Sequence, residues 1–264
     1  MTGSTDAADS PERTPENADS HAPGTDTPAA PAWASKAPKR KHGVLRKVLI
    51  VVAIVVVLLV VLYFVMVTFV ARSYLIPSEA MEPTLHGCSG CVDDHVIVNK
   101  LTYRFSSPQP GDVIVFKAPP AWNPVGYKSE DDLVKRIIAV GGQTVECRVS
   151  TGLTVDAKPL TEPYLDPATM MVDPAVYPCL GPEFGPVKVP DGRLWVMGDN
   201  RTHSADSRAH CTNTPADAQR RLLCTGDPMA GTVSVDNVIG KVRFIAWPPS
   251  RWGEVGSVNP QSGH

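Results

Sequence analysis

The sequence has almost no net charge, since 25 Lys and Arg residues stand against 27 Asp and Glu residues, giving −2 at pH 7. A strongly basic field is therefore absent, which argues against a nucleic-acid partner. No internal repeat is visible, and collagen and coiled-coil patterns are missing. Hydrophobic residues make up 43%. That share excludes disorder along the whole chain and fits one or two domains.

The N-terminal part lacks the apolar residues that a folded core needs. Residues 1–35 are rich in Pro, Ala, Thr, Ser and Asp, so they cannot bury enough surface to offset their chain entropy. We predict a disordered tail here that serves as a solvated spacer. A basic cluster completes the segment 1–47; its members are Lys36, Lys39, Arg40, Lys41, Arg46 and Lys47.

Residues 48–71 contain no charged side chain and are almost wholly apolar. A helix of this length, at about 1.5 Å per residue, crosses a hydrocarbon layer of about 30 Å. The run is too long, and begins too far along the chain, for an ordinary cleaved signal. We predict a transmembrane helix over 48–71. The basic cluster before it predicts a single-pass protein of the plasma membrane, with residues 1–47 in the cytoplasm and 72–264 outside it.

Cysteine is absent before residue 88, and all six cysteines follow the apolar run. An even number on the predicted oxidising side favours disulfides. Proximity alone suggests the pairs 88–91, 147–179 and 211–224. A zinc site at Cys88 and Cys91 would need His86 or His95, and the chain has no second CxxC. We therefore predict no metal.

Helical patterns are scarce after residue 72, apart from a weak one near 215–223. Short β-like runs bounded by Gly, Pro and Asp recur instead. They lie at 95–98, 112–117, 133–140, 143–149, 152–156, 193–197 and 238–247. We predict a mainly β fold, an antiparallel sheet or barrel-like domain over 72–264. Its Pro-rich stretch 159–190 shows little strand pattern and belongs to an inserted lobe at about 150–190.

Three segments concentrate polar groups in unexpected places: 73–85, 132–142 and 198–208. Lys135 and Arg136 sit in an apolar run on a predicted strand, so we expect one of them to point inward. Desolvation would lower the pKa of a buried lysine, and a neutral lysine can act as a general base. Each segment alone also fits a simpler interpretation: both side chains could snorkel to solvent, and 198–208 could be a surface turn.

Together these segments resemble the type I signal peptidases, the membrane-bound Ser/Lys endopeptidases that remove signal peptides from exported proteins. PSEAMEPTL resembles the family's PSxSMxPTL box, GDVIVF and LVKRIIAVGG its next two boxes, and GDNRTHSADSR the GDNxxxSxDSR box. The likeness covers the anchor and most of 72–247. The cysteine-bearing regions and the middle lobe are similar to actinobacterial members. The resemblance implies secretory preproteins as substrates, a bilayer as partner, no cofactor, and a monomer.

The resemblance also implies roles for individual residues. Lys135 matches the general base, and Ser78 matches the serine whose hydroxyl contributes to the oxyanion hole, together with the N–H of residue 80. Ser204 matches the serine that orients the lysine. The supporting charged residues are Asp206, Arg208, Arg136 and Asp199. Candidate walls of the substrate pockets are Ile76, Met81 and Val134.

Position 80 departs from the family pattern. The family's nucleophilic serine immediately precedes the methionine, and here Ala80 stands there. A methyl group cannot attack a carbonyl, so we predict a protein that is catalytically inactive. Because the backbone N–H of residue 80 remains, we expect substrate binding to persist. The other matched positions are all present, which favours an inactivating substitution over inherited decay.

Three other interpretations remain open at this stage. A natural pseudoenzyme would act as a membrane-anchored peptide-binding protein. A cysteine transpeptidase of the sortase kind would use Cys224 with His203, and it requires a free thiol. A plain receptor or structural ectodomain would leave the matched segments unexplained.

Overall fold

The computed structural model describes residues 42–66, 70–125, 131–211 and 227–262. The predicted tail, the predicted helix near 215–223 and Cys224 lie outside these ranges. The chain divides into two compact units, residues 1–52 and 53–264. The prediction of a mainly antiparallel β fold behind one N-terminal helix is confirmed.

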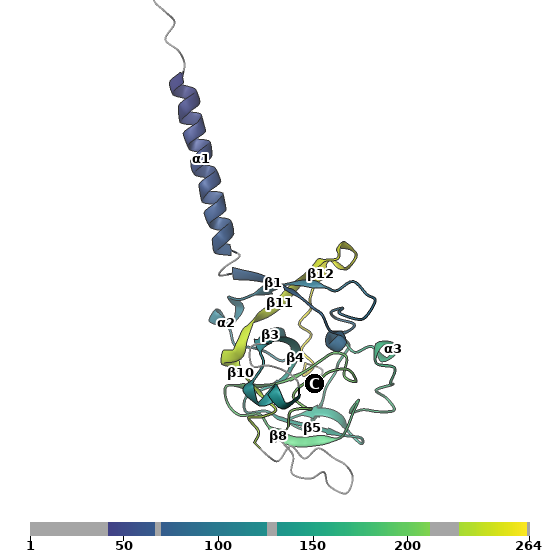
Figure 1. Cartoon of the computed structure of the whole chain (residues 1–264). Coiled ribbons are helices and arrows are strands. Elements are labelled where there is room, and N and C mark those ends of the chain that lie inside the picture. The colour runs from purple at the N-terminus through teal and green to yellow at the C-terminus, as the bar shows by residue number, and fades with distance from the viewer. Residues whose placement is uncertain (1–41, 67–69, 126–130, 212–226, 263–264) are drawn as a thin grey trace, which may run out of the picture. The chain divides into compact units, whose positions relative to one another are not determined.

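Helix α1 spans His42–Val65 and is drawn in purple in Figure 1. Within its segment Gly43–Val65, the most apolar 18-residue window has a mean hydropathy of 3.6 and no buried residue, and α1 is the one helix among the described residues long and apolar enough to cross a membrane. The helix begins before residue 48 and ends before residue 71, because Ala71 already pairs with β2.

The larger sheet has eight antiparallel strands in the order β1-β2-β11-β3-β4-β9-β10, with β12 paired to β11. Their bounds are β1 Ala71–Leu75, β2 His95–Asn99, β3 Val113–Lys117, β4 Asp132–Val140, β9 Arg193–Met197, β10 Val233–Ser234, β11 Val238–Trp247 and β12 Gly253–Glu254. In the part of the chain that the structure describes, five short helical turns connect these strands. They are η2 Glu79–Met81, α2 Thr102–Phe105, η3 Pro120–Val125, η4 Val235–Asn237 and η5 Pro249–Arg251.

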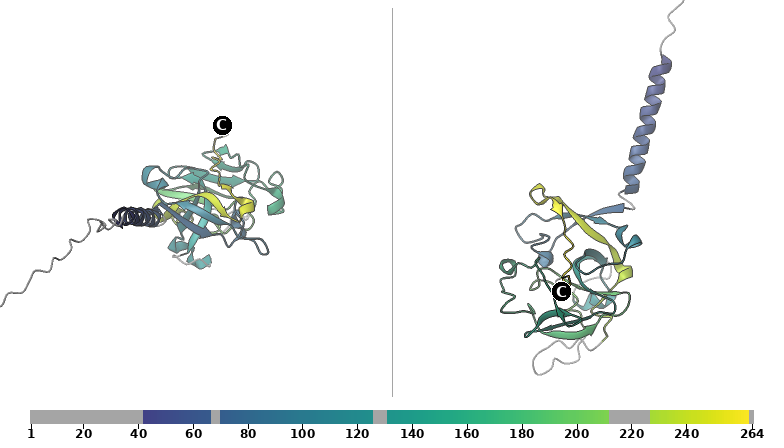
Figure 2. Two further views of the ribbon diagram at one scale, coloured as in Figure 1. Left: turned by 90° about the horizontal axis from the view of Figure 1, so that it is seen from above. Right: turned by 180° about the vertical axis from the view of Figure 1, so that it is seen from behind.

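A second sheet of four strands has the order β7-β6-β5-β8. It comprises β5 Thr144–Arg148, β6 Gly152–Val155, β7 Lys158–Pro159 and β8 Phe184–Lys188, and the short helix α3, Pro167–Met170, precedes β8. In Figure 1 and in the rear view of Figure 2, the green strands of this sheet lie at the end of the β domain opposite the yellow β12.

Strand β8 lies inside the stretch 159–190, whose sequence shows little strand pattern. Pro186 interrupts the apolar pattern of this segment, yet Phe184 and Val187 on either side of it are buried. The strand tolerates proline because β8 is an edge strand, where a missing N–H costs no ladder bond on the open side. The lobe therefore contributes β8 to the smaller sheet, while residues 160–183 contain no strand and one short helix, α3.

Two of the predicted disulfides are confirmed, Cys88–Cys91 and Cys147–Cys179. The second joins β5 to the lobe before β8. None of the cysteines in the described residues is free.

Candidate active site

The segment between β1 and β2 folds into a buried turn. Ser78 has extended backbone dihedrals and precedes η2, which holds Ala80 and Met81, 6% and 1% exposed. Met81 packs with Ile76, Leu85 and the valines of β2 and β3 in one apolar cluster. A side chain at Gly87 would overlap with the backbone of Ile76 and Ser78. The apolar packing of Met81 and the close backbone approach at Gly87 therefore both fix the conformation of this turn.

Lys135 lies on β4, which contacts η2, and it is only 3% exposed. Burial lowers its pKa to about 8, with Arg208 adding to the decrease while Asp206 and Asp199 oppose it. A lysine of this kind is substantially neutral near pH 8 and can accept a proton.

Arg136 is buried as well, which corrects the expectation that only one of the two neighbours points inward. Its Nε and Nη2 donate to the two carboxylate oxygens of Asp199 at 2.8 and 2.7 Å. Nη1 donates to the carbonyl oxygen of Gly111 at 2.8 Å, and Thr84 Oγ1 donates to Asp199 at 2.5 Å. A bidentate, fully hydrogen-bonded pair is the arrangement that makes a buried arginine tolerable.

Asp206 and Arg208 form a second buried ion pair. Arg208 Nε and Nη2 donate to the carboxylate at 2.9 and 2.8 Å, and the N–H of Gly198 donates to it at 3.1 Å. Burial acts to raise the pKa of Asp206, but the charge and hydrogen bonds of Arg208, the charge of Lys135 and the N–H of Gly198 together lower that pKa overall. Asp206 therefore stays ionised beside Lys135.

Gly198 brings the first and third polar segments into contact. A Cβ at this position would overlap with Ser204 Oγ and with the carbonyl oxygen of Ala80. The N–H of Asn200 also donates to that carbonyl at 3.1 Å. The hydroxyl of Ser204 is buried and has no hydrogen-bond partner among the described residues.

A cavity of about 320 Å³ lies where the turn meets β4. Strand β4 pairs with β9 only from Arg136 onward, so the first residues of β4 have one open edge. The cavity is lined by Ser78, Lys135 and the three predicted wall residues, Ile76, Met81 and Val134, together with Tyr74, Leu75, Pro77, Asp131, Asp132 and Leu133. The structure therefore brings the predicted base, oxyanion and wall residues to one cavity.

Two residues of the site were missed from the sequence, Glu162 and Tyr164 of the lobe. Glu162 forms a buried ion pair with Arg201, and the Tyr164 hydroxyl donates to Glu162 at 2.7 Å. The Tyr164 ring lies 4.0 Å from the Arg136 guanidinium carbon. They lie within the Pro-rich stretch 159–190, which has no periodicity, so the sequence carries no signal for this contact.

Glu82 lies near Cys88 and Cys91, a combination that could hold a metal ion. The disulfide between the two sulfur atoms leaves no thiolate for such an ion.

The family model described as "Signal peptidase, peptidase S26" matches residues 47–247. The chain belongs to this signal peptidase family. It is 59% identical over 269 residues to "Signal peptidase I" of Mycobacterium tuberculosis, covering 93% of this chain and 84% of that protein. It is 64% identical over 224 residues to "Probable signal peptidase I" of Mycobacterium leprae, covering 76% of each.

Among solved structures, a signal peptidase I from Enterococcus faecalis V583 is 27% identical and covers 52% of this chain and 97% of its own, with a TM-score of 0.35. Together with helix α1, the family membership indicates a single-pass membrane protein.

Proposed function

We propose that this chain carries the Ser/Lys site of a type I signal peptidase, with alanine in place of the nucleophile, so that it binds secretory preproteins without cutting them. The observation that carries the proposal is the buried Lys135, which lines one cavity with Ser78. The turn that holds Ala80 contacts the strand of this lysine.

In an Ala80→Ser form, the serine oxygen attacks the carbonyl carbon of the scissile bond, and its proton passes to neutral Lys135. The motif match assigns Ser204 to orienting the lysine, although its hydroxyl has no hydrogen-bond partner among the described residues, and Asp206 stays ionised through Arg208. The N–H of residue 80 and the Ser78 hydroxyl stabilise the oxyanion; losing one such donor costs on the order of 10²–10³ in rate. Protonated Lys135 then donates to the leaving amine, and water hydrolyses the ester.

The substrate segment before the cut lies extended between residues 76–80 and 131–135. The open edge of β4 supports this placement, because it can pair with an added strand. Small residues at the −1 and −3 positions, in the A-x-A pattern, enter shallow apolar pockets walled by Ile76, Met81 and Val134. The segment 72–264 works outside the cytoplasm as a monomer, and residues 1–47 remain inside.

The chain as it stands lacks a nucleophile at position 80, because a methyl group has no electron pair to donate. Ala80 is almost fully buried, and the N–H of residue 80 does not depend on the side chain. The binding surface therefore persists while the chemistry is lost.

The test is a paired cleavage assay in detergent on the present chain, Ala80→Ser, and Ala80→Ser combined with Lys135→Met. All three receive a preprotein with an A-x-A site, and mass spectrometry locates any cut. Cleavage after A-x-A by Ala80→Ser alone supports the proposal. A folded Ala80→Ser protein that binds but does not cut points to the natural pseudoenzyme, and cutting by the alanine form contradicts the assignment of position 80.

A further inference from the structure

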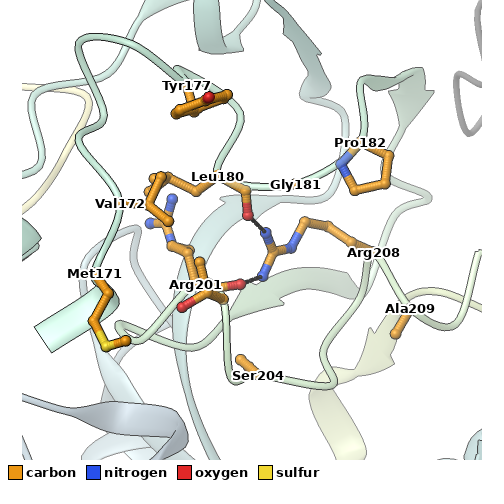
Figure 3. Close-up of a pocket in the computed structure, with 11 residues that line it drawn as sticks. Met171, Val172, Tyr177, Leu180, Gly181, Pro182, Arg201, Ser204, Arg208 and Ala209 are labelled. Atoms are coloured by element: carbon orange, nitrogen blue, oxygen red, sulfur yellow. Dashed lines mark hydrogen bonds between the residues drawn. The ribbon is translucent and has the colours of Figure 1, made fainter.

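A second and larger cavity, of about 790 Å³, lies between the lobe and the loop that follows β9. In Figure 3 the lobe residues Tyr177, Val172 and Met171 border it on the left, and Ser204 lies at the bottom of the view. Its other lining residues are Leu180, Gly181, Pro182, Arg201, Thr202, Arg208 and Ala209. None of the roles proposed above uses this cavity.

Ser204 connects this cavity to the reaction centre. It lines the cavity. Its hydroxyl and the carbonyl oxygen of Ala80 both lie so close to Gly198 that a Cβ on this glycine would overlap with them. The smaller cavity, with Ser78 and Lys135, borders the same turn. Ser204 of the larger cavity thus lies near the turn that borders the smaller one.

A polypeptide bound with its scissile bond at residue 80 must continue beyond the cut. An extended chain advances about 3.3 Å per residue, so the first few residues after the bond reach the region beyond Ser204. The smaller cavity is taken by the segment before the cut, which leaves the larger one for the segment after it.

The described residues that line the cavity offer apolar surface and no unpaired charge. Arg201 is paired with Glu162. Arg208 is paired with Asp206, and its Nη2 and Nη1 also donate to the carbonyl oxygens of Arg201 and Leu180 at 2.8 and 3.5 Å (Figure 3). The wall opposite carries Met171, Val172 and Tyr177, two of them well exposed. An apolar side chain would cover this wall, whereas a lysine would face two guanidinium groups, with no carboxylate among the described lining residues.

The wall is also fixed before any ligand arrives. The disulfide Cys147–Cys179 ties the lobe to β5 beside Leu180. The N–H of Leu180 donates to Tyr177, and that of Tyr177 donates to Asp173, both at 2.9 Å. Binding here therefore costs little ordering of the protein.

We propose that this cavity is a subsite for the mature part of the preprotein, binding an apolar side chain within the first few residues after the cut. The inference rests on the proposed function, because it takes its direction from the placement of the scissile bond at residue 80.

The present chain allows a binding test without cleavage. Two fluorescent peptides share one A-x-A region: the short one ends at the last alanine, and the long one adds about five residues containing one leucine. We expect the long peptide to bind the full chain about tenfold more tightly, measured by anisotropy, and a leucine-to-lysine change to remove that gain.

Tyr177→Asp should abolish the gain of the long peptide and leave the short peptide unaffected. Val176→Asp is the matched control, because Val176 is 61% exposed, like Tyr177 at 63%, but does not line the cavity. Equal binding of both peptides to the parent chain, or a gain that survives Tyr177→Asp, overturns the subsite while leaving the proposed function intact. Failure of both peptides to bind would instead overturn the proposed function, and the subsite with it.

Discussion

Lys135 and Arg136 are neighbours on β4 and are both buried, but their charges meet different surroundings. For Arg136, burial acts to lower the pKa, and the bidentate contact with Asp199 raises it overall. Lys135 has no ion pair among the described residues, so desolvation prevails and its pKa falls to about 8. Arg136 therefore stays charged in a structural ion pair, whereas Lys135 can lose its proton and is available for proton transfer.

The pKa of Lys135 predicts the pH dependence of the Ala80→Ser enzyme. Below pH 8 the lysine is increasingly protonated and cannot take the serine proton, so kcat/KM should fall about tenfold per pH unit and should level off above about 8. Initial rates between pH 6 and 9 on one A-x-A peptide would measure this. A flat profile in that window would contradict the role of Lys135.

Lys135→Met provides the control, because it should abolish activity in Ala80→Ser without unfolding the protein. The folded pKa of about 8 lies below the ordinary value of 10.5, so the unfolded chain binds more protons between these two pH values, and stability rises with pH there. Below pH 8 the substitution should therefore raise the free energy of unfolding by about 3 kcal/mol, and the gain should shrink toward pH 10.5. Urea unfolding of Ala80→Ser with and without Lys135→Met, at pH 7 and at pH 10, measures this difference in the free energy of unfolding.

At the scale of elements, the strands that alternate or carry continuous apolar runs were predictable, including β2, β3, β4 and β11. Strand β8 was not predictable, because Pro186 interrupts its apolar pattern. Proline is tolerated in this strand because β8 lies at the edge of its sheet. The residues of the site likewise divide into those that the sequence predicts and those that it does not. Lys135 and Ser204 lie in motifs that the sequence displays, whereas Glu162 and Tyr164 reach the site only through the fold of the lobe.

The contact of the lobe with the 198–208 loop should be important for stability. Glu162→Gln leaves the buried Arg201 without its carboxylate, and breaking a buried pair in this way costs about 3–5 kcal/mol. Lys117→Gln is the control, because its pair with Asp132 has a side chain 47% exposed and should cost at most about 1 kcal/mol. Urea unfolding of both variants would show the difference, and equal small losses would mean that the lobe does not support the loop.

At the scale of the whole molecule, α1 gives the chain its membrane character. Two arginines at Leu58 and Leu59 would place charges near the middle of the helix, where each costs about 2.5–3.5 kcal/mol on insertion scales. We expect Leu58→Arg/Leu59→Arg to move the protein from the membrane pellet to the supernatant after carbonate extraction. Met66→Arg, after the end of the helix, should remain in the pellet; release of both or of neither would contradict a span over this segment.

The position of β11 bears on the order in which the protein is made. This strand ends at Trp247 and lies between β2 and β3, so among the described residues β1 and β2 join the rest of the sheet only through it. Chains are synthesised from the N-terminus, and β4 with its lysine emerges well before β11. A chain interrupted before residue 238 would hold the lysine without the strand pairing that brings the turn to it. In the Ala80→Ser form, protease activity would thus be withheld until β11 had emerged and paired.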